Sequence, residues 1–245
     1  MVSDLDEFWG DLSSAARACV QAPMLPLISV ILILPAEVLP LFPLGQITAW
    51  LGVTELLLVA FGVFSVGWVG MQRIWFRRIF EGRPVTGSEV WGQSWGFFYR
   101  YLILGLTVGF PYLVLIVWLI VPVGSGTRAQ HRLPNWWLAF SLAYSFVLDI
   151  VLTFVTPALA FATRRVSEAW KIGITMIGST WPKSAAYTIA PPLTLLGLAT
   201  LNPTRLPALV AMLFAVVSVL IGMVLKGAIA AYFLRHSPVR ASTTS

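Results

Sequence analysis

Long apolar runs separated by short polar stretches dominate the chain. Six runs have about the length, near 20 residues, that a helix needs to cross the hydrocarbon core of a bilayer. None shows the alternation that marks a strand of an outer-membrane barrel. The pattern predicts an all-α polytopic membrane bundle of six transmembrane helices: Pro23–Leu44, Ile47–Gly70, Tyr101–Val123, Trp136–Ala162, Ser184–Leu201 and Leu206–Leu234. The fifth is the shortest and contains Pro191-Pro192, so we expect it to be kinked or to cross only in part.

A segment of mixed character precedes each pair of expected spans. Apolar residues recur there at helical spacing. Such stripes are typical of helices that lie in the membrane interface, and equally of helices packed on the end of their own bundle. We expect three amphipathic interfacial helices on the cytoplasmic side. Their stripes are Leu5, Phe8, Trp9, Leu12, Ala16 and Cys19; Trp91, Trp95, Phe98 and Leu102; and Trp170, Ile174, Ile177 and Trp181.

Two of these segments have similar sequences. Ser88-Glu89-Val90-Trp91 corresponds to Ser167-Glu168-Ala169-Trp170, and each follows a pair of arginines. The correspondence suggests a single membrane domain over residues 1–235, followed by a flexible tail over 236–245. The domain would hold three units of interfacial helix plus transmembrane hairpin, at residues 4–70, 71–163 and 164–235.

Composition agrees with a membrane protein and charge gives the orientation. Hydrophobic residues make up 58% of the chain and charged residues only 11%, which is too few to cover a water-facing surface. With the N-terminus inside, twelve Lys and Arg fall on the inner side and three on the outer side, leaving out Lys226 within the sixth span. Basic loops stay in the cytoplasm. We therefore expect a multi-pass protein of the plasma membrane with both termini cytoplasmic.

Basic clusters also predict the partner. The net charge of +6 is spread between apolar runs, so it points to anionic lipid headgroups at the cytoplasmic face and not to nucleic acid. The candidate lipid contacts are Arg77, Arg78, Arg164 and Arg165. A membrane-protein partner is also compatible with this face.

Four ionisable residues fall inside expected spans, where a charge is costly unless it finds water or a partner. Glu37 and Glu55 lie toward the outer ends of their spans, and outer-face water is the favoured explanation for both. Asp149 lies about 20 Å deep at 1.5 Å per residue. It is either a structural acid bonded to a neighbouring hydroxyl or a functional one. A pair between Asp149 and Lys226 is a further hypothesis.

Enzymatic chemistry is not expected. The chain has no P-loop and no His-Glu-x-x-His motif, and a single cysteine excludes a cysteine-based metal cluster. We expect no catalytic residues, cofactor or metal. The favoured function is a non-enzymatic scaffold, assembly or lipid-organising role at the membrane. The alternative is a small transporter or carrier that uses Asp149 in a proton or cation path.

One stretch resembles a known pattern. Residues 154–159 read Phe-Val-Thr-Pro-Ala-Leu, and residues 164–170 read Arg-Arg-Val-Ser-Glu-Ala-Trp. An apolar-Pro span end, a basic turn and an interfacial helix in this order resemble an uncharacterised bacterial polytopic family. That family is similar to the membrane domain attached to some glycerophosphodiester phosphodiesterases. The resemblance implies the topology but no activity, because no polar stretch is long enough to hold the phosphodiesterase catalytic domain.

Overall fold

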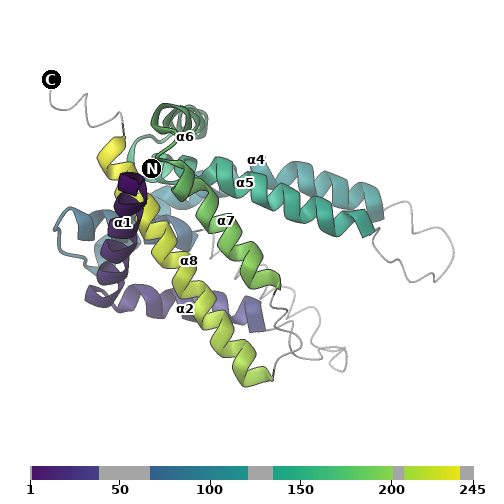
Figure 1. Cartoon of the computed structure of the whole chain (residues 1–245), viewed down its shortest axis with the longest axis horizontal. Helices are drawn as coiled ribbons and strands as arrows, with labels where there is room; N and C mark the ends of the chain where they lie inside the picture. Colours follow the sequence, from purple (N-terminus) through teal and green to yellow (C-terminus); the bar gives the residue numbers. More distant parts are fainter. Residues whose placement is uncertain (1, 39–66, 121–134, 201–206, 238–245) are drawn as a thin grey trace.

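The computed structural model describes residues 2–38, 67–120, 135–200 and 207–237, and every regular element in these ranges is a helix. Figure 1 shows their arrangement. The helices are α1 (Val2–Gln21), α2 (Met24–Val38), an unlabelled helix over residues 67–80, α4 (Gly87–Ile120), α5 (Asn135–Phe161), α6 (Val166–Thr180), α7 (Ala185–Thr200) and α8 (Ala208–His236).

Two described helices are long and apolar enough to cross a membrane. They are α5, over Ala139–Phe161, and α8, over Leu209–His236. A third candidate is the pair α1 and α2, whose axes meet at 90°. The helix bounds of α5 and α8 fall within two residues of the fourth and sixth expected spans. The other expected spans include residues outside the described ranges or form shorter helices, so the structure supports a multi-pass membrane protein at this coarser level.

The prolines are accommodated without ending a helix. α7 continues through Pro191-Pro192, and α4 and α5 continue through Pro111 and Pro157. At 16 residues α7 is about 24 Å long, which is short of the hydrocarbon thickness. Residues 201–206, which follow α7 directly, lie outside the described ranges, so a kinked or only partly crossing fifth span stays a prediction.

The segment before the third span differs from the expectation. Sequence alone predicts a separate interfacial helix there, but residues 87–120 form one continuous helix of 34 residues. Nothing in the sequence between the two parts breaks a helix, because Tyr101 follows Arg100 without an intervening Pro or Gly. The amphipathic segment is thus the first part of α4.

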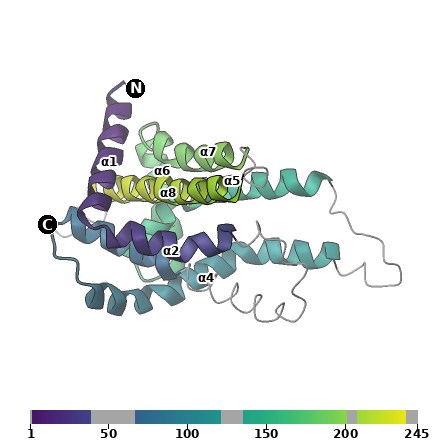
Figure 2. The same cartoon turned by 90° about the horizontal axis from the view of Figure 1, so that it is seen from below.

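α1 and α6 lie at the same end of the molecule, beside the last turns of α8 (Figure 1). Seen from below, α1 runs across the direction shared by α2, α7 and α8 (Figure 2). α1 packs on α8, and α6 packs on α5. The three proposed repeat units stay a prediction, but their amphipathic helices do contact spans of other units.

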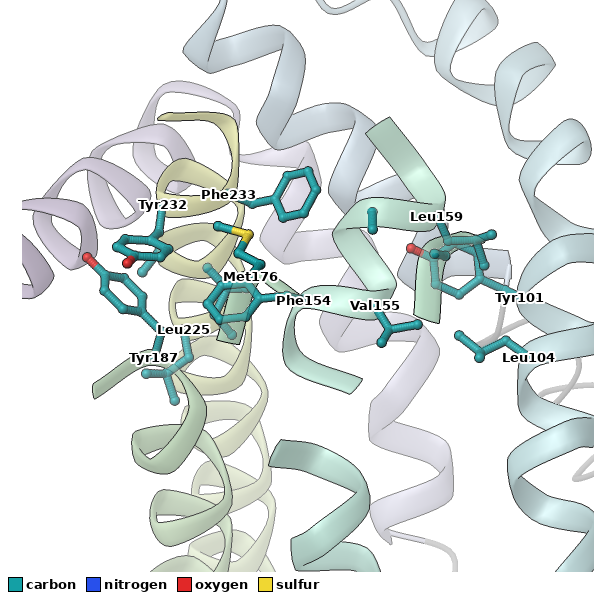
Figure 3. Packing of buried hydrophobic residues seen from close by; sticks show 14 of the residues in the cluster. Tyr101, Leu104, Phe154, Val155, Leu159, Met176, Tyr187, Leu225, Tyr232 and Phe233 are labelled. Atoms are coloured by element: carbon teal, nitrogen blue, oxygen red, sulfur yellow. The ribbon is translucent and has the colours of Figure 1, made fainter. Parts of the chain in front are cut away.

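The core is built where these helices meet. Phe154, Val155 and Leu159 of α5 lie among Met176 of α6 and Phe233 of α8 (Figure 3). Burial of such side chains contributes about 1.5–3 kcal/mol each relative to exposure. Because residues of α1, α4 and α7 join the same cluster, this core fixes the positions of six helices at one end of the bundle.

Glycines allow two close helix contacts. A Cβ at Gly173 would lie 2.6 Å from Val155 Cγ2, and one at Gly227 would lie 2.7 Å from Ala15 Cβ. These residues bring α6 onto α5 and α1 onto α8. The pair Gly105 and Gly109, which has the spacing of a close-packing motif, meets no described atom within 4 Å. The close approaches among the described helices therefore occur at Gly173 and Gly227 and not at this pair.

Candidate functional site

A cavity of about 540 Å³ lies among the helix over residues 67–80, α5, α7 and α8. Apolar side chains, among them Leu152 and Phe214, form much of its lining. Seven polar residues also line it, and we call the site the polar cavity: Gln72, Arg73, Asp149, Thr153, Thr156, Ser218 and Lys226. Its volume falls in the range of about 300–1,000 Å³ that is typical of ligand sites.

Arg73 is the most buried charged side chain of the polar cavity, with 3% of its surface exposed. It donates hydrogen bonds to the backbone oxygen of Lys226 at 2.5 Å and to Oγ1 of Thr156 at 3.1 Å. In the described part of the chain no carboxylate forms an ion pair with it, and its Nε has no hydrogen-bond partner. A guanidinium does not deprotonate in proteins. Among the described residues, Arg73 is therefore a buried cation without a compensating anion.

Gln72 lies beside Arg73 and is also incompletely satisfied. Its Nε2 donates to Oγ of Ser29 at 2.8 Å, and Nε1 of Trp68 donates to the same hydroxyl at 2.9 Å. Ser29 in turn donates to the Leu25 backbone oxygen. These bonds hold the Gln72 side chain in place, but its Oε1 has no partner among the described residues. The cavity thus contains an ordered acceptor beside an ordered cation.

Asp149 and Lys226 face the same cavity. Both are partly buried, and their helices α5 and α8 are in contact. Within the described residues no ion pair or hydrogen bond joins the two side chains. The Thr153 hydroxyl bonds to the Asp149 backbone oxygen at 2.7 Å, not to its carboxyl group. Asp149 and Lys226 therefore line one cavity, and a direct pair between them stays a hypothesis.

A second cluster of charges joins α1 to the ends of α7 and α8. Asp11, 2% exposed, accepts bonds from both terminal nitrogens of Arg235 and from the Tyr187 hydroxyl at 2.6 Å. Glu7 contacts the same arginine at 3.1 Å. Asp11 is not part of the apolar stripe of α1 described above. The structure shows that this acid is buried because a two-point guanidinium contact satisfies it.

The four basic candidates for lipid contact differ in their surroundings. Arg77 pairs with Glu81 at 2.9 Å and lies over the ring of Phe161 at 5.7 Å. Arg78 donates to the Pro84 backbone oxygen at 3.3 Å. Arg164 and Arg165 are both exposed.

The turn that presents the second pair is ordered by Thr163. Its hydroxyl accepts the Arg165 backbone N–H at 3.1 Å and donates to the Glu168 carboxylate. Glu168 also contacts the Arg165 guanidinium at 3.4 Å, where that arginine side chain is 79% exposed. An exposed pair of this kind is weak, so Arg164 and Arg165 are the two that remain accessible to headgroups.

The acids expected near the outer ends of the first two spans are not placed. Glu55 lies outside the described residues, and of Glu37 only the backbone, within α2, is described. Over the described ranges no group of three His, Cys, Asp or Glu side chains is arranged to hold a metal ion.

Residues 92–96 read Gly-Gln-Ser-Trp-Gly, which has the Gly-x-Ser-x-Gly spacing of a hydrolase nucleophile elbow. That function requires a sharp strand-to-helix turn, which exposes the serine at the top of a sheet. Here the five residues lie inside the continuous helix α4. The match is therefore one of spacing alone.

Sequence reasoning missed Arg73 and Asp11. Arg73 was included among the inner-side charges and given no further role, although Gln72 and Arg73 are two polar residues between the apolar Met71 and Ile74. This pair of polar residues in an apolar stretch was the feature that could have identified Arg73 as a candidate site residue. Asp11 gave no such signal, because its partners are more than 170 positions away in the chain.

No family model, curated protein or solved structure matches the chain. The resemblance described for residues 154–170 accordingly stays a prediction. The candidate sites rest on their own geometry, namely the polar cavity and the two amphipathic helices at one end of the bundle.

Proposed function

We propose that the protein is a six-spanning, non-enzymatic membrane protein of the plasma membrane that organises anionic lipid at its cytoplasmic face. The observation that carries this proposal is the placement of α1 and α6. Both lie at one end of the bundle, and each packs one face on it while exposing apolar side chains on the other. Trp9 is 65% exposed and Trp181, next to the end of α6, is 58% exposed. Tryptophan at such a position suits the boundary between headgroups and hydrocarbon.

Charge supports the same orientation. The exposed Arg164 and Arg165 directly precede α6, and the exposed Trp181 directly follows it. Basic and aromatic side chains therefore flank the two ends of the same helix. Each basic residue near an anionic leaflet contributes about 1 kcal/mol of attraction. The alternatives of interfacial helix and helix packed on its own bundle are then compatible, because the two faces of each helix serve different contacts. A protein partner on this face would compete with lipid for these same side chains.

Lipid selection tests the proposal. The wild-type protein and the double variant Arg164→Gln/Arg165→Gln would be extracted from native membrane in polymer-bounded discs, and the ratio of anionic to zwitterionic lipid would be measured. Arg128→Gln/Arg132→Gln is the matched control, because it removes the same charge from the expected outer loop. We expect anionic lipid to fall only in the first variant, by about fivefold per arginine if each contributes about 1 kcal/mol. Equal ratios in both variants would exclude lipid selection by this face.

The topology has its own experiment. Reporter fusions after Arg83, Arg165 and Arg240 should be cytoplasmic, and a fusion after Arg128 should be external. The expectation follows from the distribution of basic residues between loops. A cytoplasmic reporter at Arg128 would rule out six spans with both termini inside.

A carrier function remains the second candidate, favoured by one observation: Asp149 faces a cavity large enough for a small solute. Arg73 and Lys226 line the same cavity, and two positive charges disfavour a cation there. Of the two carrier hypotheses, a cation path and a proton path, the proton path is therefore the one we retain. Proton-coupled uptake into proteoliposomes that disappears in Asp149→Asn, with the folded fraction unchanged, would favour the carrier over the lipid-organising function.

A further inference from the structure

We propose that the polar cavity is a binding site for the phosphate group of an anionic amphiphile, with Arg73 as its principal contact. The inference is independent of the proposed function, because it concerns a site between helices and not the exposed faces of α1 and α6. It begins from the charges that face the cavity. Arg73 and Lys226 are positive and Asp149 is negative, so the described side chains that line the cavity carry one excess positive charge.

Hydrogen bonds to two helices fix the position of the positively charged Arg73 guanidinium. The two hydrogen bonds of Arg73 go to α8 and α5, and the Tyr101 hydroxyl bonds to the Thr156 backbone oxygen at 2.6 Å. These bonds hold the guanidinium in position without neutralising it. The Arg73 side chain lines the cavity, and its buried Nε has no hydrogen-bond partner among the described residues. Arginine suits phosphate because its planar fork of donors matches the phosphate oxygens.

Gln72 narrows the chemistry of the ligand. Gln72 lines the cavity, and its buried Oε1 accepts no hydrogen bond from a described residue. A ligand that carries a hydrogen-bond donor beside its negative charge therefore suits this side chain. A singly protonated phosphate monoester has both, an O–H and an anionic oxygen. A chloride ion or a carboxylate offers only the negative charge.

The apolar lining indicates why an amphiphile fits better than a free anion. Leu152, Leu198, Phe214 and Val219 line the same cavity as Arg73. Apolar walls gain from contact with hydrocarbon, and they leave a fully hydrated anion without compensation. The cavity therefore combines a site for the charged group with a surface for the first part of an alkyl chain.

Gly222 offers a way to block the cavity without removing a charge. It lines the cavity, and no described atom lies within 4 Å of the position its Cβ would take. Gly222→Leu should fill part of the space, whereas Gly222→Ala adds one methyl group and leaves most of it. The pair separates occupancy of the cavity from changes in the helix backbone, because both variants replace the glycine.

The experiment measures the thermal transition of the purified full-length protein in dodecyl maltoside, with dodecyl phosphate or inorganic phosphate added. A ligand that binds only the folded state raises the transition temperature with concentration. We expect dodecyl phosphate to stabilise the wild type and Gly222→Ala, and Gly222→Leu to weaken that binding by about tenfold or more. Asp149→Asn should strengthen the binding of dodecyl phosphate, because Asp149 is the one negative side chain among the described residues that line the cavity.

The two phosphates distinguish the source of the ligand. A shift with dodecyl phosphate alone supports a lipid-derived ligand, whereas an equal shift with inorganic phosphate, also lost in Gly222→Leu, supports a water-soluble anion at the same site. Arg73→Gln should abolish either shift, but that variant also loses two interhelical hydrogen bonds. The comparison of Gly222→Leu with Gly222→Ala is therefore the deciding test of binding in the cavity. No shift in the wild type, or equal shifts in Gly222→Leu and Gly222→Ala, would overturn the proposal.

Discussion

Removing the charge of Asp11 should loosen α1 from the bundle. This side chain is 2% exposed and receives both terminal nitrogens of Arg235, one of them at 2.6 Å. Tyr187 donates to it as well. Asp11→Asn keeps the size and shape of the side chain but removes its charge, and places an amide N–H where a carboxylate oxygen accepted a bond. The contacts of α1 with α7 and α8 are both affected.

The magnitude follows from those contacts. A hydrogen bond to a charged group contributes about 1.5–3 kcal/mol, so two such bonds set an upper range of about 3–6 kcal/mol. The loss is smaller here because the Arg235 side chain is 44% exposed and keeps Glu7 at 3.1 Å, so the stranded cation stays partly hydrated. We expect Asp11→Asn to lower the free energy of unfolding by about 2–3 kcal/mol.

Glu7→Gln is the matched control. It removes a carboxylate of the same helix that contacts the same arginine, but Glu7 is 27% exposed. Partly exposed pairs contribute about 0–1 kcal/mol. Unfolding in mixed micelles with increasing dodecyl sulfate, followed by tryptophan fluorescence, gives both free energies. If Asp11→Asn costs no more than Glu7→Gln, burial does not strengthen this contact and the assignment of Asp11 as the clamp of α1 is wrong.

Three further outcomes are expected. Gly173→Ala should lower the free energy of unfolding by about 1–3 kcal/mol, because the new Cβ would lie 2.7 Å from the Val155 backbone nitrogen. Gly178→Ala, on the same helix but with no described atom within 4 Å of its Cβ position, should raise that free energy by about 0.5–1 kcal/mol. Similar effects of the two substitutions would contradict the close packing of α6 on α5. In a double-mutant cycle, Asp149→Asn and Lys226→Met should couple by less than the 3–5 kcal/mol of a buried contact pair, and a coupling of that size would establish direct pairing. Burial raises the pKa of the Cys19 thiol to about 11, so iodoacetamide labelling at pH 8 should be about a hundredfold slower than for a free thiol and rise tenfold per pH unit; a rate equal to glutathione's would refute this.

The sequence predicted best what depends on local composition. The bounds of α5 and α8 came within two residues because each is a long apolar run with polar residues at its ends. The amphipathic character of α1 and α6 was also predictable, since side chains of a helix return to one face every three to four residues. The fusion of the second amphipathic segment with α4 was not predicted, because a change of amphipathic character without a helix breaker does not end a helix.

Long-range contacts account for the remainder. Whether a glycine permits a close approach depends on what lies opposite, and Val155 lies opposite Gly173 while no described atom lies opposite Gly105. The spacing within one helix contains no information about that neighbour. Asp11 likewise looks like any exposed acid of an amphipathic helix until Arg235 is placed beside it.

Charges inside this bundle divide by whether the protein itself satisfies them. Asp11 has both oxygens bonded to Arg235, so its charge is fully used in holding helices together. Arg73 also bridges helices, yet its partners are a carbonyl and a hydroxyl, which orient a cation without neutralising it. A buried cation left in that state is costly to the folded protein. No described carboxylate compensates the Arg73 charge, and this is the physical reason to look for function in the polar cavity and not at the better-paired cluster.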